Sequence, residues 1–319
     1  MVQETIISLL QIVIFPGFLF FIIAAFFYEW VDRKFVARLQ NRYGPLHTGP
    51  LGLLQPFADF LKLLSKEDII PYAADKLLFS VVPIFMLSLP FTALFCIPIV
   101  NSTAPISFEG DLILVIFITT LIVISVFIGA WSSTNRFSTI GGMRACLQML
   151  GYEIPMTIVI AGPAIAAKTL SISKIVQWQT AGFWFILTQP LGFIIVAICF
   201  LAELQKIPFD IPKAETEVVA GWLTEFSGKK LALLRLAGDL EFVLAGSIMT
   251  SLYLGGSSGF WFMPPFVWFI IKLTVCILIL SNLRGLFARF RIDQLMRGVW
   301  KYLTPLALLQ IILVELIPW

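Results

Sequence analysis

The chain has 319 residues, of which 59% are hydrophobic and only 13% are charged, whereas a soluble domain carries about a quarter charged residues. With 30 Phe, 9 Trp and a formal net charge of +3, this composition excludes an ordinary soluble enzyme and gives no sign of a nucleic-acid-binding surface. It is typical of an integral membrane protein.

Runs of about 20 apolar residues, long enough to span a bilayer, occur about eight times. None alternates with a period of two, so the pattern predicts helices and excludes a β-barrel. We therefore expect an all-α membrane protein, a bundle of about eight transmembrane helices with long cytoplasmic loops, in a single polytopic domain over residues 1–319. The expected helices lie near residues 5–28, 77–99, 111–133, 149–168, 182–202, 238–256, 261–283 and 302–318.

Lysine and arginine predict the orientation of these helices. All but three of the 22 basic residues lie in four segments, 29–76, 134–148, 203–237 and 284–301. The positive-inside rule places these segments in the cytoplasm, so both termini of this multi-pass cell-membrane protein are predicted to be extracytoplasmic. Within the first segment, residues 50–64 form an amphipathic pattern that fits either a helix in the membrane interface or a helix packed on a partner protein.

Few residues could build a metal, haem or nucleotide site. His47 is the only histidine, and no glycine-rich phosphate loop follows a strand pattern. No CxxC motif or Cys/His cluster exists, because the cysteines are scattered at Cys96, Cys146, Cys199 and Cys276. We expect no cofactor and no metal in this chain.

Charged residues inside the expected spans are candidates for function, because a charge in the bilayer interior costs several kcal/mol. Glu153 lies near the start of the fourth span, Glu203 ends the fifth and Lys272 lies in the middle of the seventh. Since a buried carboxylate can hold a proton, we predict that these three residues belong to a proton relay. Asp239 and Glu241, at the start of the sixth span, are interpreted as interfacial residues.

The segment that follows Glu203 adds further acidic residues among apolar ones, which indicates a buried loop. Pro208 and Pro212 should prevent a continuous helix over residues 207–212. We expect the loop to extend the relay, with an ordinary solvated loop as the alternative. Its acidic residues are Asp210, Glu215, Glu217 and Glu225.

Four stretches of the sequence, in this order, carry a family resemblance. They are Asp32-Arg33-Lys34 with Gln40-Asn41-Arg42-Tyr43-Gly44-Pro45 and Gly49 to Asp59; Gly141-Gly142 with Tyr152-Glu153-Ile154-Pro155; Leu201-Ala202-Glu203 with Pro208-Phe209-Asp210-Ile211-Pro212; and Arg291-Ile292-Asp293-Gln294-Leu295-Met296. Together they resemble the heel subunit of respiratory complex I, known in bacteria as the H-type subunit, and its relatives in membrane-bound hydrogenases and sulfane sulfur reductases.

The resemblance implies a non-catalytic subunit of an oxidoreductase complex of the translocase type. Its partners would be a cytoplasmic iron–sulfur subunit and a hydrogenase-like large subunit, antiporter-like and small membrane subunits, and lipid, but no nucleic acid. Iron–sulfur clusters, with nickel-iron or flavin groups, would belong to the partners. The residues expected to dock the peripheral arm are Arg33, Arg38, Arg42, Asp59, Lys62, Lys206 and Arg291.

The stretch 204–207 departs from the quinone-reducing members, which usually carry an Asn-Arg pair there. Its Lys206-Ile207 form is similar to membrane-bound energy-converting hydrogenases. We therefore expect a redox-driven proton or sodium pump of the ferredoxin- or NAD(P)H-linked hydrogenase branch or of the sulfane sulfur reductase branch, close to archaeal complexes. The alternative is a quinone-reducing NADH dehydrogenase subunit. A stand-alone secondary transporter is more remote, since inverted repeats are absent, and a membrane anchor would not explain the placement of Glu153, Glu203 and Lys272.

Overall fold

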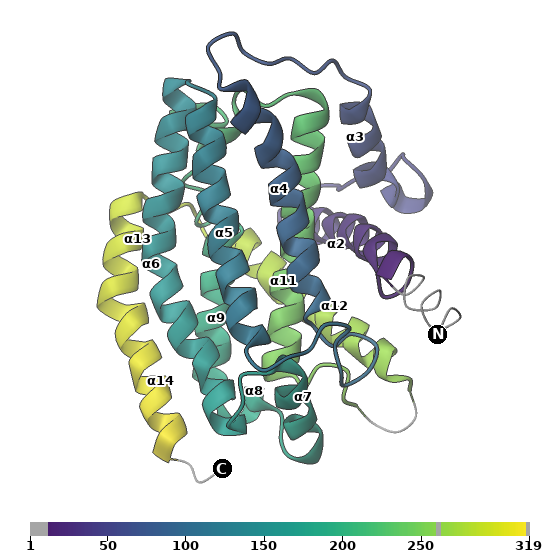
Figure 1. Cartoon of the computed structure of the whole chain (residues 1–319), viewed down its shortest axis with the longest axis vertical. Coiled ribbons are helices and arrows are strands. Elements are labelled where there is room, and N and C mark those ends of the chain that lie inside the picture. The colour runs from purple at the N-terminus through teal and green to yellow at the C-terminus, as the bar shows by residue number, and fades with distance from the viewer. Residues whose placement is uncertain (1–11, 260–262, 317–319) are drawn as a thin grey trace.

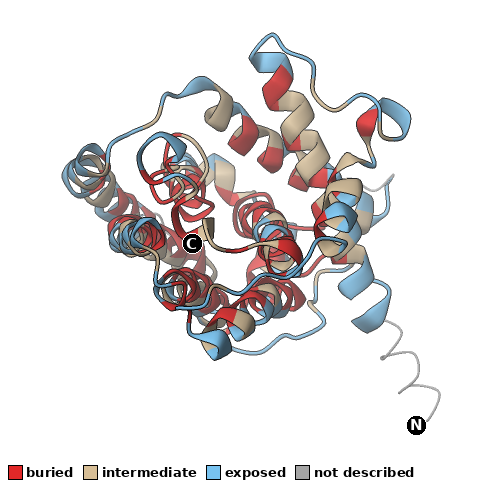
Figure 2. Ribbon diagram, turned by 90° about the horizontal axis from the view of Figure 1, so that it is seen from above, coloured by how far each residue is buried: buried red, intermediate tan, exposed pale blue. Residues whose placement is uncertain are grey.

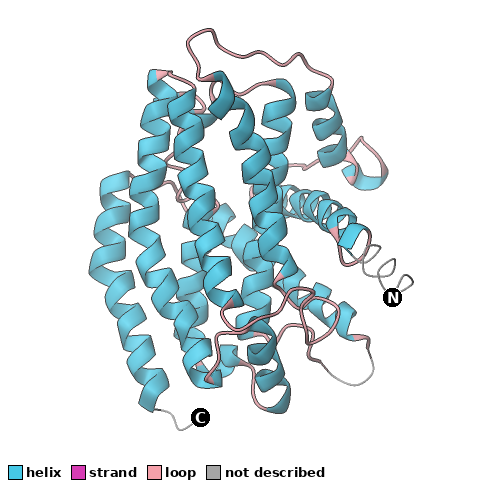
Figure 3. Ribbon diagram, in the orientation of Figure 1, coloured by secondary structure: helices cyan, strands magenta, loops and turns pink. Residues whose placement is uncertain are grey.

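The computed structural model describes residues 12–259 and 263–316. Within these ranges the chain forms helices joined by loops and turns, without a strand (Figure 3). The prediction of an all-α membrane protein is confirmed.

The body of the molecule is a set of helices that run side by side in Figure 1. They are α4 (Lys76–Phe95), α5 (Asp111–Ser132), α6 (Arg136–Ala167), α9 (Pro190–Glu203), α11 (Gly228–Tyr253) and α14 (Thr304–Leu316). Helix α2 (Phe18–Leu39) is strongly tilted against them and packs on α11 and α12 (Pro265–Leu286).

Shorter helices close the two ends of this bundle. At the end where α6 finishes lie α7 (Ile172–Ala181) and α8 (Phe185–Thr188). The other short elements are α3 (Gln55–Leu64), α10 (Glu215–Val218), α13 (Ile292–Gly298), two 3-10 turns (Pro50–Gly52 and Gly221–Leu223) and a π-helical turn (Val299–Leu303).

Five helical stretches of the described chain are long and apolar enough to cross a membrane: α4, α5, α6, α12 and the continuous stretch Ile292–Leu316. The first expected span, 5–28, falls partly on residues outside the described ranges, and its described part continues as α2 to Leu39. The expected fifth span is interrupted: α9 begins only at Pro190 and has 14 residues. The expected sixth span begins ten residues early, at Gly228, as part of α11.

The expected loop over residues 134–148 is wrong, because α6 already begins at Arg136. The Asn135 side chain accepts a hydrogen bond from the Phe137 amide (2.9 Å) and caps the helix. Gly141 then lets α6 approach the turn at residues 221–223 so closely that a Cβ at this position would lie 2.6 Å from the Trp222 nitrogen. The sequence prediction missed this charged start of α6 because hydropathy detects only the part of a helix that is apolar enough to face lipid.

The described core is formed by inward faces of all the long helices. Figure 2 shows buried residues along the inner faces of the helices and exposed residues in the loops and on outer faces. Aromatic pairs join separate elements, as in the stacked rings of Phe79 on α4 and Phe226, whose centroids are 4.3 Å apart.

Helix α3 is the amphipathic segment expected at residues 50–64. It packs on α2 and α11 of the same chain, with Leu63 buried and the Phe60 ring 5.6 Å from that of Phe26. Phe57 and Leu61 remain exposed, so part of its apolar face is left for lipid or a partner.

Candidate functional site

A cavity of about 370 Å³ lies between α2, α3, α4, α5, α11 and the loop that follows α9. Apolar residues such as Met86, Ile122 and Leu234 form part of its wall. Its charged lining residues are Glu29, Arg33, Asp59, Glu203, Lys206, Asp210, Lys213, Glu215, Arg235, Asp239, Glu241 and Arg284.

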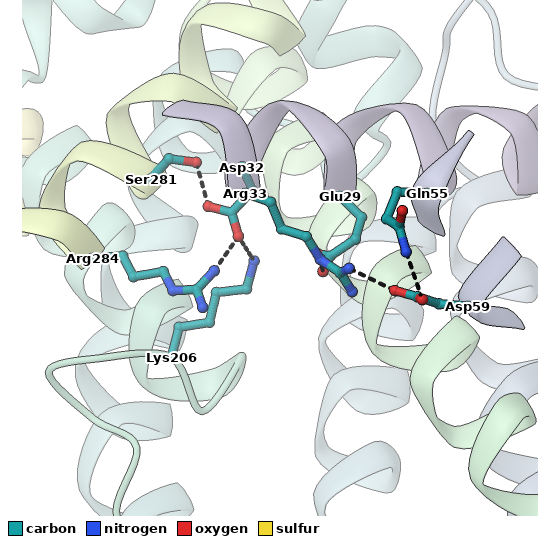
Figure 4. A network of polar contacts seen from close by, with 8 residues as sticks. All are labelled: Glu29, Asp32, Arg33, Gln55, Asp59, Lys206, Ser281 and Arg284. Carbon is teal, nitrogen blue, oxygen red and sulfur yellow. Dashed lines mark hydrogen bonds and ion pairs between the residues drawn. The ribbon is translucent and has the colours of Figure 1, made fainter. Parts of the chain in front are cut away.

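The first polar cluster of the cavity joins α2 to α3. Arg33 donates from Nε to Glu29 Oε1 (2.6 Å) and from Nη1 to Asp59 Oδ2 (2.9 Å), while Gln55 Nε2 donates to Asp59 Oδ1 (3.0 Å) (Figure 4). Burial raises the pKa of Asp59, but the hydrogen bonds from Arg33 and Gln55 outweigh it and hold that pKa below its ordinary value of 3.8. The carboxylate of Asp59 is therefore ionised at neutral pH.

The second polar cluster surrounds Asp32, whose side chain is fully buried. Its carboxylate accepts hydrogen bonds from Lys206 Nζ (2.9 Å), Ser281 Oγ (2.7 Å) and Arg284 Nη1 (Figure 4). Lys206 also lies over the Phe242 ring, 3.2 Å from its centroid. This cluster ties α2, the loop after α9, α11 and α12 together at one point beside the cavity.

The inner part of the cavity is lined by carboxylates of α9 and α11. Glu203 is 4% exposed, and its Oε2 has no hydrogen-bond partner in the described chain. Its electrostatic neighbours are Glu241 and Glu153. Glu153 accepts a hydrogen bond from Thr120 Oγ1 and so connects this group to α5.

The loop after α9 supplies another part of the cavity wall. No helix forms over residues 207–212, as the two prolines predict. Burial raises the pKa of Asp210 above its ordinary value, although Lys213 and Arg289 partly offset it. Burial also lowers the pKa of Lys213, against the opposing effect of Asp210. Both groups are therefore easier to neutralise than in water, and Glu215 lines the cavity beside them.

Three residues expected in the relay lie elsewhere. Glu217 is exposed and pairs with Arg144 (2.5 Å), which holds the pKa of Glu217 below its ordinary value through their hydrogen bond and charge. Glu225 accepts a hydrogen bond from Asn135 Nδ2 and does not line the cavity. Lys272 is the third, and it is surrounded by backbone carbonyls and not by acidic side chains of the described residues.

The ammonium group of Lys272 is enclosed by backbone carbonyls at the end of the bundle opposite the basic loops. It donates to the oxygens of Leu254 (2.5 Å), Gly256 (3.2 Å) and Ser258, and it lies 4.3 Å from the centroid of the Trp184 ring. All three carbonyls follow the end of α11, so the lysine closes that loop. The structure does not bring Lys272 to the cavity carboxylates.

The residues expected to dock a peripheral arm divide into two groups. Arg33, Asp59 and Lys206 belong to the polar clusters of the cavity. Lys62 lies 3.8 Å from Asp59, at the exposed side of α3. The side chains that remain exposed are Arg38, Arg42 and Arg291.

Some functional candidates were missed in the sequence. Asp239 and Glu241, interpreted there as interfacial, both line the cavity. Their signal was present, since they are the only acidic residues in the expected span 238–256. The sequence did not indicate that Asp32 and Arg284 form a buried cluster, because they are 252 positions apart and only the fold brings them into contact.

The described chain holds no group of three or more His, Cys, Asp or Glu side chains arranged to bind a metal. The candidate site consists of titratable groups around a cavity in a helical membrane protein. The fold and the site together define a membrane subunit that carries ionisable residues from its basic loops into the helix bundle.

The chain belongs to the NADH dehydrogenase family, whose model matches residues 10–315. It is 35% identical over 320 residues to an H-type subunit of the NADH-quinone oxidoreductase of Geobacter sulfurreducens, covering 94% of this chain and 92% of the relative. It is 40% identical over 290 residues to the corresponding NADH-quinone oxidoreductase subunit of Bacillus mycoides, covering 90% and 87%. A third relative, the same subunit from Dehalococcoides mccartyi, is 36% identical over 306 residues, covering 96% and 85%.

These comparisons confirm the resemblance to the heel-subunit family of complex I. They favour the quinone-reducing alternative, because these relatives are named as NADH-quinone oxidoreductase subunits. They give no support to the hydrogenase or sulfane sulfur reductase branch, which was the main expectation from residues 204–207.

Proposed function

We propose that this chain is the membrane subunit of an NADH-quinone oxidoreductase complex, in which a quinone headgroup enters the cavity and is reduced by electrons from a docked iron–sulfur protein. The observation that carries the proposal is a cavity that combines an apolar wall, two ionic clusters and a row of carboxylates that includes the buried Glu203. Apolar side chains suit a quinone ring and tail, and polar groups can orient the quinone oxygens.

Reduction of a quinone to a quinol consumes protons, and in this proposal the chain's own acidic residues deliver them. The proposed route starts at Asp210 and Glu215 in the segment after α9 and continues to Glu241 and Glu203, all of which line the cavity. Glu153 lies beyond them, between α5 and α6. In this proposal these carboxylates exchange protons during quinone reduction and pass the change in charge toward neighbouring membrane subunits.

Docking belongs to the same proposal. In this proposal the basic segments 29–76 and 203–237 form the cytoplasmic face on which iron–sulfur and further catalytic subunits would sit, with their clusters and flavin. Arg42 and Arg291 are exposed there and can meet acidic partner residues. Lys272, Glu217 and Glu225 are left out of the relay because each is bonded away from the cavity.

The competing hydrogenase branch retains one argument, which is the residue Lys206 at a position where quinone-reducing members usually carry Asn-Arg. In the structure this lysine is bonded to Asp32 and lies on the cavity wall. A proton-reducing or sulfur-reducing complex would need no quinone in this cavity.

A photoreactive quinone analogue tests the choice between these branches. In membranes that hold the intact complex, the analogue should label cavity residues such as Leu63 or Trp222, and excess quinone should prevent the labelling. NADH oxidation should depend on added quinone in the same membranes. Hydrogen or sulfide production without quinone-dependent NADH oxidation, and without labelling, would contradict the proposal.

A further inference from the structure

A second hollow, of about 220 Å³, lies beside the cavity in the basic segment 29–76. Its walls come from α2, from the loop after α2 and from the last turn of α12. Within the described chain no acidic side chain lines it. The lining residues are Arg33, Val36, Ala37, Arg42, Tyr43, Gly44, Pro45 and Arg284.

The arginines of this hollow carry more positive charge than their neighbours balance. Arg42 has no carboxylate partner in the described chain, and its Nε donates only to Gln40 Oε1 (2.9 Å). Arg284 shares the single carboxylate of Asp32 with Lys206. Arg33 is already bonded to acidic residues on the cavity side. An anion in the hollow would meet the free guanidinium N–H groups of Arg42 and the unbalanced charge at Arg284.

The hollow is a fixed feature of the fold. Lys34 Nζ donates to the carbonyls of Pro45 (2.9 Å) and Leu51 (3.0 Å), which ties the loop to α2. The loop lies so close that a Cβ on Gly44 would be 3.2 Å from the Lys34 Cα. At the rim Tyr43 is 90% exposed. Arg and Tyr are the residues that protein interfaces favour near their centres.

We propose that this arginine hollow receives an acidic side chain of the cytoplasmic protein that docks on this subunit. The inference rests on the proposed function only in requiring such a partner. Guanidinium groups bind carboxylates in a fixed, two-pronged geometry, which gives the partner a register as well as an attraction. We choose a partner side chain over an anionic lipid because the exposed rim residue, Tyr43, is of a type that protein interfaces favour.

Two arginines connect this hollow to the cavity. Arg33 and Arg284 line both spaces, and they are also the residues that hold Glu29, Asp59 and Asp32. A carboxylate that enters the hollow draws on the same guanidinium groups. Arrival of the partner is thereby linked to the arrangement of both polar clusters beside the cavity.

The test uses Arg42→Lys in the intact complex, because Arg42 lines the hollow but not the cavity. A water-soluble, zero-length carbodiimide joins an amine to a carboxylate in direct contact, and mass spectrometry then identifies the joined peptides. Arg38→Lys is the matched control, since Arg38 is exposed on α2 and lines neither space. The native pair of Lys62 and Asp59, 3.8 Å apart, reports that the reagent works.

Coupling from position 42 to an Asp or Glu of a cytoplasmic iron–sulfur subunit, at least fivefold above coupling from position 38, is the expected result. Coupling only to lipid or to carboxylates of this chain would overturn the inference, as would no product at position 42 when Lys62 has reacted. In a second arm, Arg42→Glu should at least halve the salt concentration that releases the cytoplasmic subunits, and Arg38→Glu should not. Coupling in a complex that fails to reduce quinone would refute the proposed function while leaving this inference intact.

Discussion

Replacing Asp32 by Asn tests whether the buried cluster fastens α2 to the rest of the subunit. The change keeps the shape of the side chain but leaves Lys206 and Arg284 without their shared counter-charge. Removing one partner of a buried ion pair costs about 3–5 kcal/mol. Because the Lys206 and Arg284 side chains are 16% and 31% exposed, water can solvate them in part, and we expect the lower end of that range.

A loss of about 3 kcal/mol corresponds to a factor of about 150 in an equilibrium constant, since each 1.4 kcal/mol is tenfold. The assay is the rate at which the detergent-solubilised complex loses this subunit at a fixed elevated temperature. We expect a rise of up to about 100-fold for Asp32→Asn. The control Glu217→Gln breaks an exposed pair with Arg144, worth at most about 1 kcal/mol, and should change the rate by no more than about fivefold. Equal rates for the two variants would refute this account of the cluster.

Gly141→Ala should destabilise the complex by about 1–3 kcal/mol in the same assay, because the new Cβ meets the Trp222 backbone, whereas Gly298→Ala, with open space around it, should not destabilise it. Because the pKa of Asp59 is held below 3.8, the stability that its carboxylate contributes is present above 3.8 and is lost as the pH falls through the lowered pKa. Asp59→Asn should therefore make the thermal stability of the complex depend less on pH between pH 6 and pH 3. Unchanged acid sensitivity would count against the cluster. Lys272→Met should expose residues 254–258 to proteases added from the membrane side opposite the basic loops, without changing the ratio of ion translocation to electron transfer. A changed ratio with normal protease resistance would return Lys272 to the relay.

Hydropathy predicted the lipid-facing helices well, as α4 and α5 show, and it failed where a helix continues through charged residues. Helix α2 runs past Glu29 because Arg33, one turn later, pairs with that carboxylate and with Asp59. The early start of α6 depends on the Asn135 cap and on contact with the turn at 221–223. Such tertiary partners leave no periodic signal in the sequence.

The candidate site was predicted in part. Glu203 and Asp210 were expected from their position at a helix end and in a proline-fixed loop, and both line the cavity. The Asp32 cluster could not be predicted, because its cations lie 174 and 252 residues away in the chain. Lys272 was misleading because it lies in the middle of its expected span, which suggested a place in a buried relay. In the structure its side chain instead donates to the carbonyls that follow α11.

Gradient formation in sealed vesicles, driven by NADH oxidation, tests the central claim most directly. The double variant Glu153→Gln, Glu203→Gln keeps side-chain volume and removes titration, so the complex should assemble. We expect the initial rate of gradient formation, per electron transferred, to fall at least tenfold. A full gradient at the parental ratio, from vesicles with the parental amount of assembled complex, would contradict the claim that Glu153 and Glu203 couple electron transfer to ion translocation.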